Sequence, residues 1–139
     1  MKKVNEEATH IGQQLLIDFY QCNYDIINCV EKLTAILKEA IEICGYQILK
    51  TISHKYEPQG ISVIVIIAES HFSIHTWPED NWAAIDIFTC GSMLKKNNII
   101  DFFSKSLGAG NYTTSNILRG NKEIAIQNNE KDIPQIKTI

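Results

Sequence analysis

The sequence predicts an α+β fold, a two-layer sandwich in which two helices cover one face of a mainly antiparallel sheet. The predicted elements run in the order β-α-β-β-β-β-α-β, and a parallel sheet would instead need strands and helices in strict alternation. One long segment shows the apolar period of a helix that buries a single side. The length of 139 residues fits one domain.

The first elements have distinct signatures. Ile11–Tyr20 mixes apolar and polar residues, ends in an aromatic pair, and is predicted to be a strand. Asp25–Cys44 is predicted to be one helix, because its apolar side chains stand 4, 3, 4, 4 and 3 residues apart. Gly45 follows where a left-handed C-terminal cap belongs.

Four strands and two turns follow. Ile61–Ala68 is apolar at nearly every residue, so we expect this strand to be buried on both faces. The strands are Tyr46–Glu57, Ile61–Ala68, Phe72–Trp77 and Ala83–Thr89, with turns at Pro58–Gly60 and Pro78–Asn81.

The chain closes with a second helix, a last strand and a polar tail. Asn98–Leu107 is predicted to be helical and to end at Gly108, and Tyr112–Leu118 is the last strand. Residues 1–120 therefore form one domain, and residues 121–139 are expected to be flexible. Helices on one face leave the other face of the sheet uncovered, which favours dimerisation.

Composition excludes several classes of function. A net charge of −3 and a pI near 5.8 leave no basic footprint, so a general nucleic-acid binder is not expected. The longest apolar run, Val63–Ala68, is far shorter than the ~20 residues of a membrane helix. The first residues lack the apolar segment of a secretion signal, so we expect a cytoplasmic protein. No metal site is expected, because the cysteines lack zinc-ligand spacing; they are Cys22, Cys29, Cys44 and Cys90.

Chemically active side chains concentrate in Ala68–Glu79. Two of the four histidines, two serines, a tryptophan and two glutamates fall within these 12 residues. Ser70 with His75 is the chemical pairing of an activated hydroxyl nucleophile. The G-x-S-x-G turn of a hydrolase is missing around Ser70, so a hydrolase triad is not favoured.

These residues form a long motif. It reads ESHFSIHTWPE over Glu69–Glu79 and AAIDIFTCG over Ala83–Gly91, with shorter upstream matches in Asp18–Cys22 and Gly60–Ser62. Over about residues 11–120, nearly all of the predicted domain, the chain resembles the bacterial and archaeal S-adenosylmethionine decarboxylase proenzymes.

The resemblance implies a cofactor made from the chain itself, a covalent pyruvoyl group (a bound pyruvate) derived from Ser70. The Ser70 hydroxyl attacks the carbonyl of Glu69, and elimination of the resulting ester cuts the backbone between these residues. The dehydroalanine tautomerises to an imine, and hydrolysis of this imine by water releases ammonia and leaves the pyruvoyl ketone. In this family the base is the histidine five residues after the serine, here His75, and Ser62 matches a position that assists processing. The products are associated chains of 69 and 70 residues.

The resemblance also implies the reaction. The ketone forms a Schiff base with S-adenosylmethionine and accepts the electrons left when carbon dioxide departs. Cys90 matches the proton donor of the family, and Glu79 matches the residue that holds the ribose hydroxyls. Trp77 and Tyr56 match positions near the adenine. The product is decarboxylated S-adenosylmethionine, the aminopropyl donor for spermidine biosynthesis, and the working form is expected to be a homodimer of processed protomers.

The sequence departs from the family in two places. Relatives usually carry Gly-x-His where this chain has Gly12-Gln13-Gln14, and Ala68 stands where serine is frequent. Pyruvoyl-dependent ornithine or arginine decarboxylation on the same scaffold is therefore an alternative. A second alternative, an unprocessed and non-catalytic homologue, predicts loss of Ser70 or Cys90, and both are present.

Overall fold

A single antiparallel sheet organises the molecule. The computed structural model describes residues 9–90 and 96–127. Its six strands lie in the order β2-β3-β4-β5-β1-β6, and every neighbouring pair is antiparallel. The strands are β1 (His10–Tyr20), β2 (Gln47–Lys55), β3 (Ile61–Ala68), β4 (Ser70–Trp77), β5 (Trp82–Cys90) and β6 (Asn111–Asn121).

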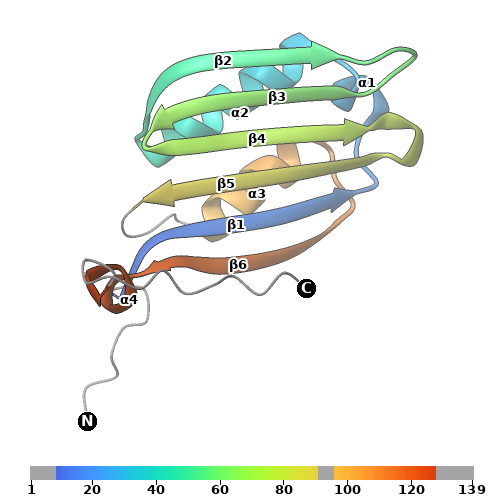
Figure 1. Ribbon diagram of the computed structural model, residues 1–139. Helices are drawn as coiled ribbons and strands as arrows, with labels where there is room; N and C mark the ends of the chain where they lie inside the picture. The colour runs from blue at the N-terminus through green and yellow to red at the C-terminus, as the bar shows by residue number, and fades with distance from the viewer. Residues whose placement is uncertain (1–8, 91–95, 128–139) are drawn as a thin grey trace.

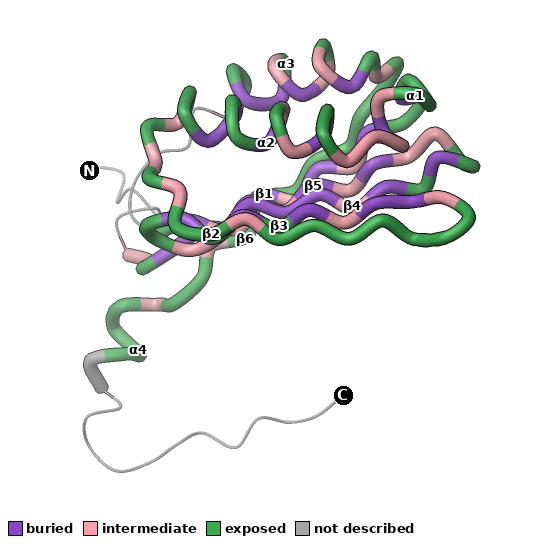
Figure 2. The backbone as a smooth tube through the Cα atoms, turned by 90° about the horizontal axis from the view of Figure 1, so that it is seen from above, coloured by how far each residue is buried: buried purple, intermediate pink, exposed green. Residues whose placement is uncertain are grey.

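Helices cover one face of this sheet (Figures 1 and 2). They are α1 (Tyr24–Ile27), α2 (Val30–Cys44) and α3 (Lys96–Ser106), while η2 (Pro78–Asp80) is a 3-10 turn between β4 and β5 and α4 (Lys122–Gln127) follows β6. The predicted α+β sandwich, with its helices on one side, is confirmed. No helix within the described ranges is long and apolar enough to cross a membrane.

The core lies between the two layers. Leu33, Leu37 and Ile41 follow the inward side of α2 and are fully buried. Phe72 of β4 and Phe103 of α3 are among the largest side chains buried with them. Gly45 ends α2 with φ of 77°, the left-handed cap that the sequence predicts.

The predicted long helix is in fact two helices, separated at Asn28-Cys29. The Ile27 carbonyl accepts a hydrogen bond from Thr76 Oγ1 at 2.8 Å, and Asn28 Oδ1 accepts one from the Gly60 N–H at 3.3 Å. These bonds tie the break to the β3–β4 region. The apolar spacing did not reveal the break, because both helices contribute residues to the same core, Ile27 from α1 and Leu33 from α2 among them.

One further expectation needs correction. Strand β3 is buried on one face only: Val63 and Val65 face the helices, whereas Ile64 and Ile66 are 38% and 41% exposed. The sequence could not show this, because an apolar residue on the uncovered face looks the same as one in the core.

Of the predicted tail, residues 121–139, Asn121 ends β6, residues 122–127 form α4, and the remainder lies outside the described residues. Its flexibility stays a prediction.

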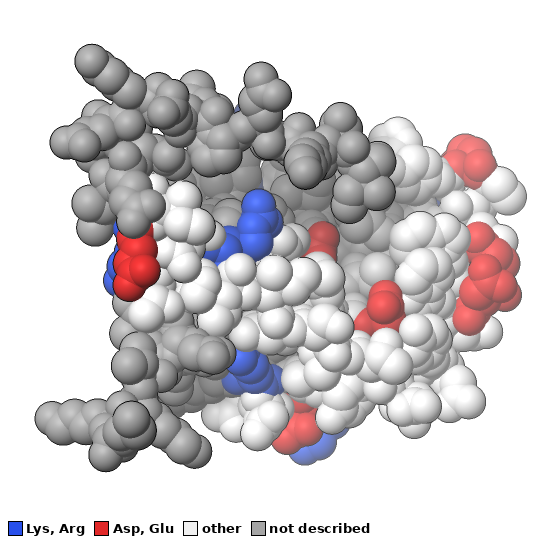
Figure 3. All heavy atoms as spheres, turned by 60° about the horizontal axis from the view of Figure 1, so that its bottom comes forward, with Lys and Arg blue, Asp and Glu red and all other residues white. Residues whose placement is uncertain are grey.

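Strand register determines where the motif lies. We call the sheet face away from the helices the outer face; it carries Ser62, Ile64, Ile66, His71, Ser73, His75, Trp77, Trp82 and Phe88. Because side chains alternate along a strand, most polar residues of the motif point to this uncovered face, toward the viewer in Figure 1. In the space-filling view of Figure 3, charged side chains of both signs are scattered among uncharged ones on the face that is seen.

Thr76 links the two layers, and its replacement by valine is expected to destabilise the fold. Its buried hydroxyl donates to the Ile27 carbonyl and accepts from the Ile61 N–H at 3.1 Å. Valine leaves both buried backbone groups unpaired, which costs about 1–3 kcal/mol for each group. Urea unfolding should show this loss, whereas Thr114→Val at an exposed position of β6 should stay within about 0.5 kcal/mol. Equal unfolding midpoints for the two variants would contradict the role of Thr76.

Candidate active site

The turn between β3 and β4 holds the proposed cleavage point. The Ala68–Glu69 peptide bond is cis, and Ser70 has φ of 101°. A positive φ is uncommon for a residue with a side chain, and such backbone strain is concentrated at functional sites. The Glu69–Ser70 bond therefore directly precedes a residue with a positive φ in the β3–β4 hairpin.

Ser70 lies beside the Cys90 thiol. Ser70 is opposite Thr89 in the β4–β5 register, so the next residue of β5 comes near its hydroxyl. Ser70 Oγ and Cys90 Sγ are 3.7 Å apart, within hydrogen-bonding distance for sulfur. Ser70 is half-buried and Cys90 exposed, and Ser70 also lines a shallow hollow of the outer face with Ile64, Ile66, His71, Ser73 and Phe88.

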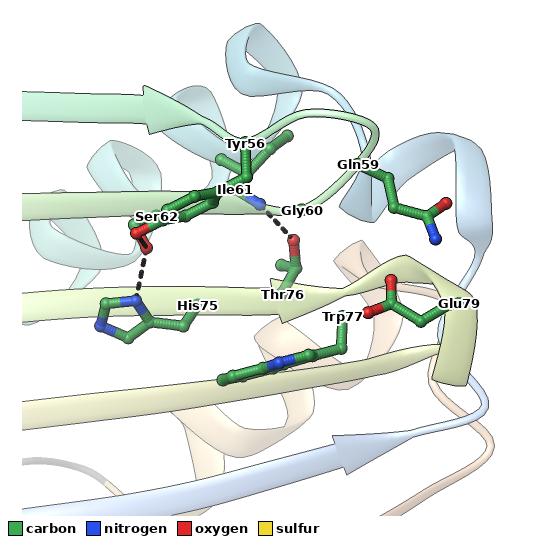
Figure 4. Close-up of a pocket in the computed structure, with 9 residues that line it drawn as sticks. All are labelled: Tyr56, Gln59, Gly60, Ile61, Ser62, His75, Thr76, Trp77 and Glu79. Atoms are coloured by element: carbon green, nitrogen blue, oxygen red, sulfur yellow. Dashed lines mark hydrogen bonds between the residues drawn. The ribbon is translucent and has the colours of Figure 1, made fainter.

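A second group of hydrogen-bonded site residues lies near the other end of β4. Ser62 and His75 are opposite each other in the β3–β4 register, and Ser62 Oγ is 2.6 Å from His75 Nδ1 (Figure 4). The hydroxyl of Tyr56 is 3.1 Å from Ser62 Oγ, which makes a chain of three hydrogen-bonding side chains. This chain fixes the orientation of the imidazole.

A cleft of about 240 Å³ adjoins this chain. Figure 4 shows side chains from the β2–β3 connection, β3, β4 and η2 around it; they are Tyr56, Gln59, Gly60, Ile61, Ser62, His75, Thr76, Trp77 and Glu79. Trp77 and Tyr56 supply aromatic rings, and the exposed Glu79 supplies a carboxylate. Aromatic faces with one carboxylate suit a ligand that has a flat ring and hydroxyl groups.

Within a single protomer, His75 lies far from Ser70. Five residues of extended strand separate them, and at ~3.3 Å per residue this corresponds to roughly 17 Å. Ser62 lies with His75, and Cys90 lies with Ser70. The site residues predicted from the sequence therefore form two clusters on one face, near opposite ends of β4.

Comparison with known proteins decides the family. A sequence model of the S-adenosylmethionine decarboxylase family matches residues 13–120. The chain belongs to this family. The S-adenosylmethionine decarboxylase proenzyme of Pelotomaculum thermopropionicum is 37% identical over 111 residues, which cover 80% of this chain and 88% of that relative. The proenzyme of the same name from Acidithiobacillus ferrooxidans is 36% identical over 110 residues, covering 79% and 83%.

Solved structures agree with this assignment. The adenosylmethionine decarboxylase of Aquifex aeolicus has a TM-score of 0.74 and 29% identity, covering 81% of this chain and 92% of that one. The Trypanosoma brucei decarboxylase monomer, at 19% identity and a TM-score of 0.52, shows likeness of fold alone; it covers 73% of this chain and 44% of that one.

The departure of this S-adenosylmethionine decarboxylase family member from the Gly-x-His pattern can now be placed. Gln13 is buried on the helix side of β1, whereas Gln14 lies on the outer face. Gln14 Oε1 accepts a hydrogen bond from Arg119 Nη1 at 2.8 Å, and the Arg119 guanidinium lies 5.2 Å from the ring centre of Phe88. The amide therefore anchors the only arginine of the chain beside the hollow that Ser70 lines.

Two other cysteines of this decarboxylase family member, Cys22 and Cys44, are partly or fully buried. Burial raises the pKa of the Cys22 thiol to about 11, and burial likewise raises the pKa of Cys44 to about 11. Both thiols thus stay protonated and unreactive at neutral pH. In the described ranges, no three His, Cys, Asp or Glu side chains are grouped so that they could hold a metal ion.

Sequence reasoning missed Trp82, Asp18 and Arg119. Trp82 stacks on Trp77, and its Nε1 donates to Asp18 Oδ1 at 3.1 Å. The sequence contains only two tryptophans, and both flank the turn at Pro78–Asn81. Residues that flank a tight hairpin turn tend to be cross-strand neighbours, so this signal could have predicted the contact.

Proposed function

We propose that the protein is a self-processing, pyruvoyl-dependent decarboxylase that converts S-adenosylmethionine to decarboxylated S-adenosylmethionine and carbon dioxide. The observation that carries this proposal is the position of Ser70. This residue follows the scissile position with a positive φ, its hydroxyl is 3.7 Å from the Cys90 thiol, and the chain belongs to the S-adenosylmethionine decarboxylase family. Decarboxylated S-adenosylmethionine donates the aminopropyl group for spermidine biosynthesis.

The surroundings of Ser70 fit formation of a pyruvoyl group. Its hydroxyl lies at an accessible turn and can attack the preceding carbonyl, so that the Glu69–Ser70 amide becomes an ester. Removal of the Ser70 α-proton then expels the Glu69 carboxylate and cuts the chain. Once formed, the pyruvoyl group supplies an electron sink for decarboxylation. No residue other than Ser70 needs to be converted.

Cys90 is positioned to deliver a proton. Its sulfur is 3.7 Å from Oγ of Ser70, the residue whose carbon atoms become the pyruvoyl group, and it is exposed on the same face. A thiol that lies beside the reacting carbon can act there as a general acid. We assign Cys90 as the donor that protonates the product carbon.

His75 is assigned as the processing base and Ser62 as its partner. Two imidazole tautomers fit the 2.6 Å contact between Ser62 Oγ and His75 Nδ1. With its proton on Nδ1, the imidazole donates to Ser62 and leaves Nε2 free to accept a proton. The Ser62–Tyr56 contact then keeps this arrangement in place.

The separation of the two clusters favours a homodimer. Ser70 and His75 both lie on the outer face, near opposite ends of β4. If a second copy packs on this face with its strands reversed, the His75 of each protomer lies over the Ser70 of the other. The exposed apolar residues of the outer face, Ile52, Ile64, Ile66 and Ile117, suit such burial. Each site would then contain residues from both protomers.

The cleft is assigned to the nucleoside part of the substrate. Glu79 can accept hydrogen bonds from both ribose hydroxyls, and Tyr56 and Trp77 offer ring faces to the adenine. Ring faces also attract a sulfonium cation. Ornithine and arginine have neither a ribose nor an adenine, so this cleft gives them no matching contacts.

Carbon dioxide release is the direct test of substrate. The purified, cleaved protein is incubated in parallel with S-adenosylmethionine, ornithine and arginine labelled in the carboxyl group. We expect release from S-adenosylmethionine only. Release from ornithine or arginine, with none from S-adenosylmethionine, would show that the substrate assignment is wrong.

Glu79→Gln is expected to weaken use of S-adenosylmethionine without affecting cleavage. The carboxylate makes charge-assisted hydrogen bonds to two hydroxyls, each worth about 1.5–3 kcal/mol. Loss of the charge should lower kcat/KM by roughly ten- to a thousandfold, at ~1.4 kcal/mol per factor of ten. Asp80→Asn, at the exposed neighbouring carboxylate that does not line the cleft, is the matched control. An unchanged kcat/KM for Glu79→Gln would show that Glu79 does not bind the ribose.

A further inference from the structure

Two tryptophans form a stacked pair at the edge of the cleft. Trp77 of β4 and Trp82 of β5 are opposite each other in the register, with ring centres 4.2 Å apart and an angle of 18° between the rings. We propose that Trp82, itself held by Asp18, is a positioning residue that fixes the Trp77 indole as the wall against which the adenine stacks. This proposal rests on the proposed function, since it concerns the same cleft.

Trp77 needs such support because of its place in the chain. It is the last residue of β4 and is 36% exposed. Trp77 lines the cleft, whereas Trp82 does not (Figure 4). Trp82 therefore covers Trp77 from outside the cleft and limits the orientations that its indole can adopt.

The Trp82 ring is fixed in turn by β1. Its Nε1–H donates to Asp18 Oδ1 at 3.1 Å, and both residues are partly buried. A carboxylate acceptor makes this hydrogen bond stronger than one to a neutral group. The support thus extends across three adjacent strands, from Asp18 on β1 through Trp82 on β5 to Trp77 on β4.

Preorganisation of Trp77 affects binding rather than chemistry. A ring that is already held loses little rotamer freedom when a ligand stacks on it, so the free energy of binding is more favourable. Trp82 does not line the cleft, and its stacking and hydrogen bond are to Trp77 and Asp18 and not to Ser70, His75 or Cys90, so kcat and self-cleavage should not depend on it. A purely structural role predicts instead that Trp82 affects unfolding alone.

The experiment uses Trp82→Leu, Asp18→Leu and Asp18→Asn in the cleaved enzyme. Trp82→Leu removes the stacking ring, Asp18→Leu removes the acceptor, and Asp18→Asn keeps an acceptor oxygen. KM and kcat for S-adenosylmethionine, self-cleavage and the unfolding midpoint are measured for each. Tyr112→Leu is the matched control, because Tyr112 packs on Phe19 away from the cleft.

We expect Trp82→Leu to raise KM about three- to tenfold, with kcat and self-cleavage within about twofold of the wild type. Asp18→Leu should raise KM by a smaller factor, and Asp18→Asn should restore it. Tyr112→Leu should lower the unfolding midpoint and leave KM unchanged. If Trp82→Leu shifts only the unfolding midpoint, or lowers kcat with unchanged KM, the proposal is overturned.

Two further measurements do not depend on turnover. Stacked indoles couple their electronic transitions and give paired circular-dichroism bands, which come from Trp77 and Trp82 because the chain has no other tryptophan. These bands should weaken in Asp18→Leu and persist in Asp18→Asn. Equal bands in both variants would show that Asp18 does not hold the Trp82 ring in place.

Binding of adenosine alone to uncleaved Ser70→Ala chains, by equilibrium dialysis, separates the two proposals. Tight binding that Trp82→Leu does not weaken overturns only the role of Trp82. If adenosine binds neither to Ser70→Ala nor to Ser70→Ala/Trp82→Leu, the nucleoside assignment of the cleft and this proposal are both overturned.

Discussion

Replacement of Ser70 by alanine is expected to leave one chain of 15.8 kDa that releases no carbon dioxide. Alanine has no hydroxyl to attack the Glu69 carbonyl, so neither the ester nor the ketone can form. The wild type should give two chains of 69 and 70 residues, the second beginning with a ketone instead of an amine. Intact-mass measurement distinguishes these products, and the C-terminal chain should resist Edman sequencing.

Cys90→Ala is the control that separates cleavage from turnover. It retains the Ser70 hydroxyl and should still be cleaved, but it lacks the proposed proton donor. General acid catalysis typically contributes ~10²–10⁴-fold, so turnover should fall by that factor. A wild-type chain that stays whole after long incubation would contradict self-processing. If Cys90→Ala is fully cleaved and turns over normally, another group must be the proton donor.

The parts of the fold that depend on local patterns could be predicted from the sequence. The inward side of α2 follows from the spacing of Leu33, Leu37 and Ile41, and its end follows from Gly45. The break after Ile27 could not be predicted. It depends on hydrogen bonds from Thr76 and to Asn28 that form only when the sheet packs on the helices.

The candidate site was likewise only partly predictable from the sequence. The motif identifies Ser70, His75 and Cys90 as site residues. Pairing of β4 with β5 then brings Ser70 and Cys90 together. Sequence spacing suggested that Ser70 and His75 would work as a pair. An extended strand instead carries them apart, because five residues cover roughly 17 Å in a strand but far less in a helix or turn.

The separation of Ser70 from His75 yields the sharpest prediction, on cleavage between protomers. Alone, His75→Ala lacks the processing base and Ser70→Ala lacks the nucleophile, so each should remain uncut. Coexpressed, they should form mixed dimers in which one site combines Ser70 of the first chain with His75 of the second. With equal expression, random pairing and one competent site in each mixed dimer, about half of the His75→Ala chains should be cleaved.

Intact-mass measurement of the coexpressed mixture should show cleavage products from the His75→Ala chain only, while Ser70→Ala stays at full length. The matched control replaces Ser70→Ala with the double variant Ser70→Ala/His75→Ala. This pair also forms mixed dimers, but no protomer supplies His75, so cleavage should disappear. If tagged chains show that mixed dimers form and the first mixture still stays uncut, His75 does not act on the Ser70 of its partner. If His75→Ala cleaves by itself at the wild-type rate, the base is another residue.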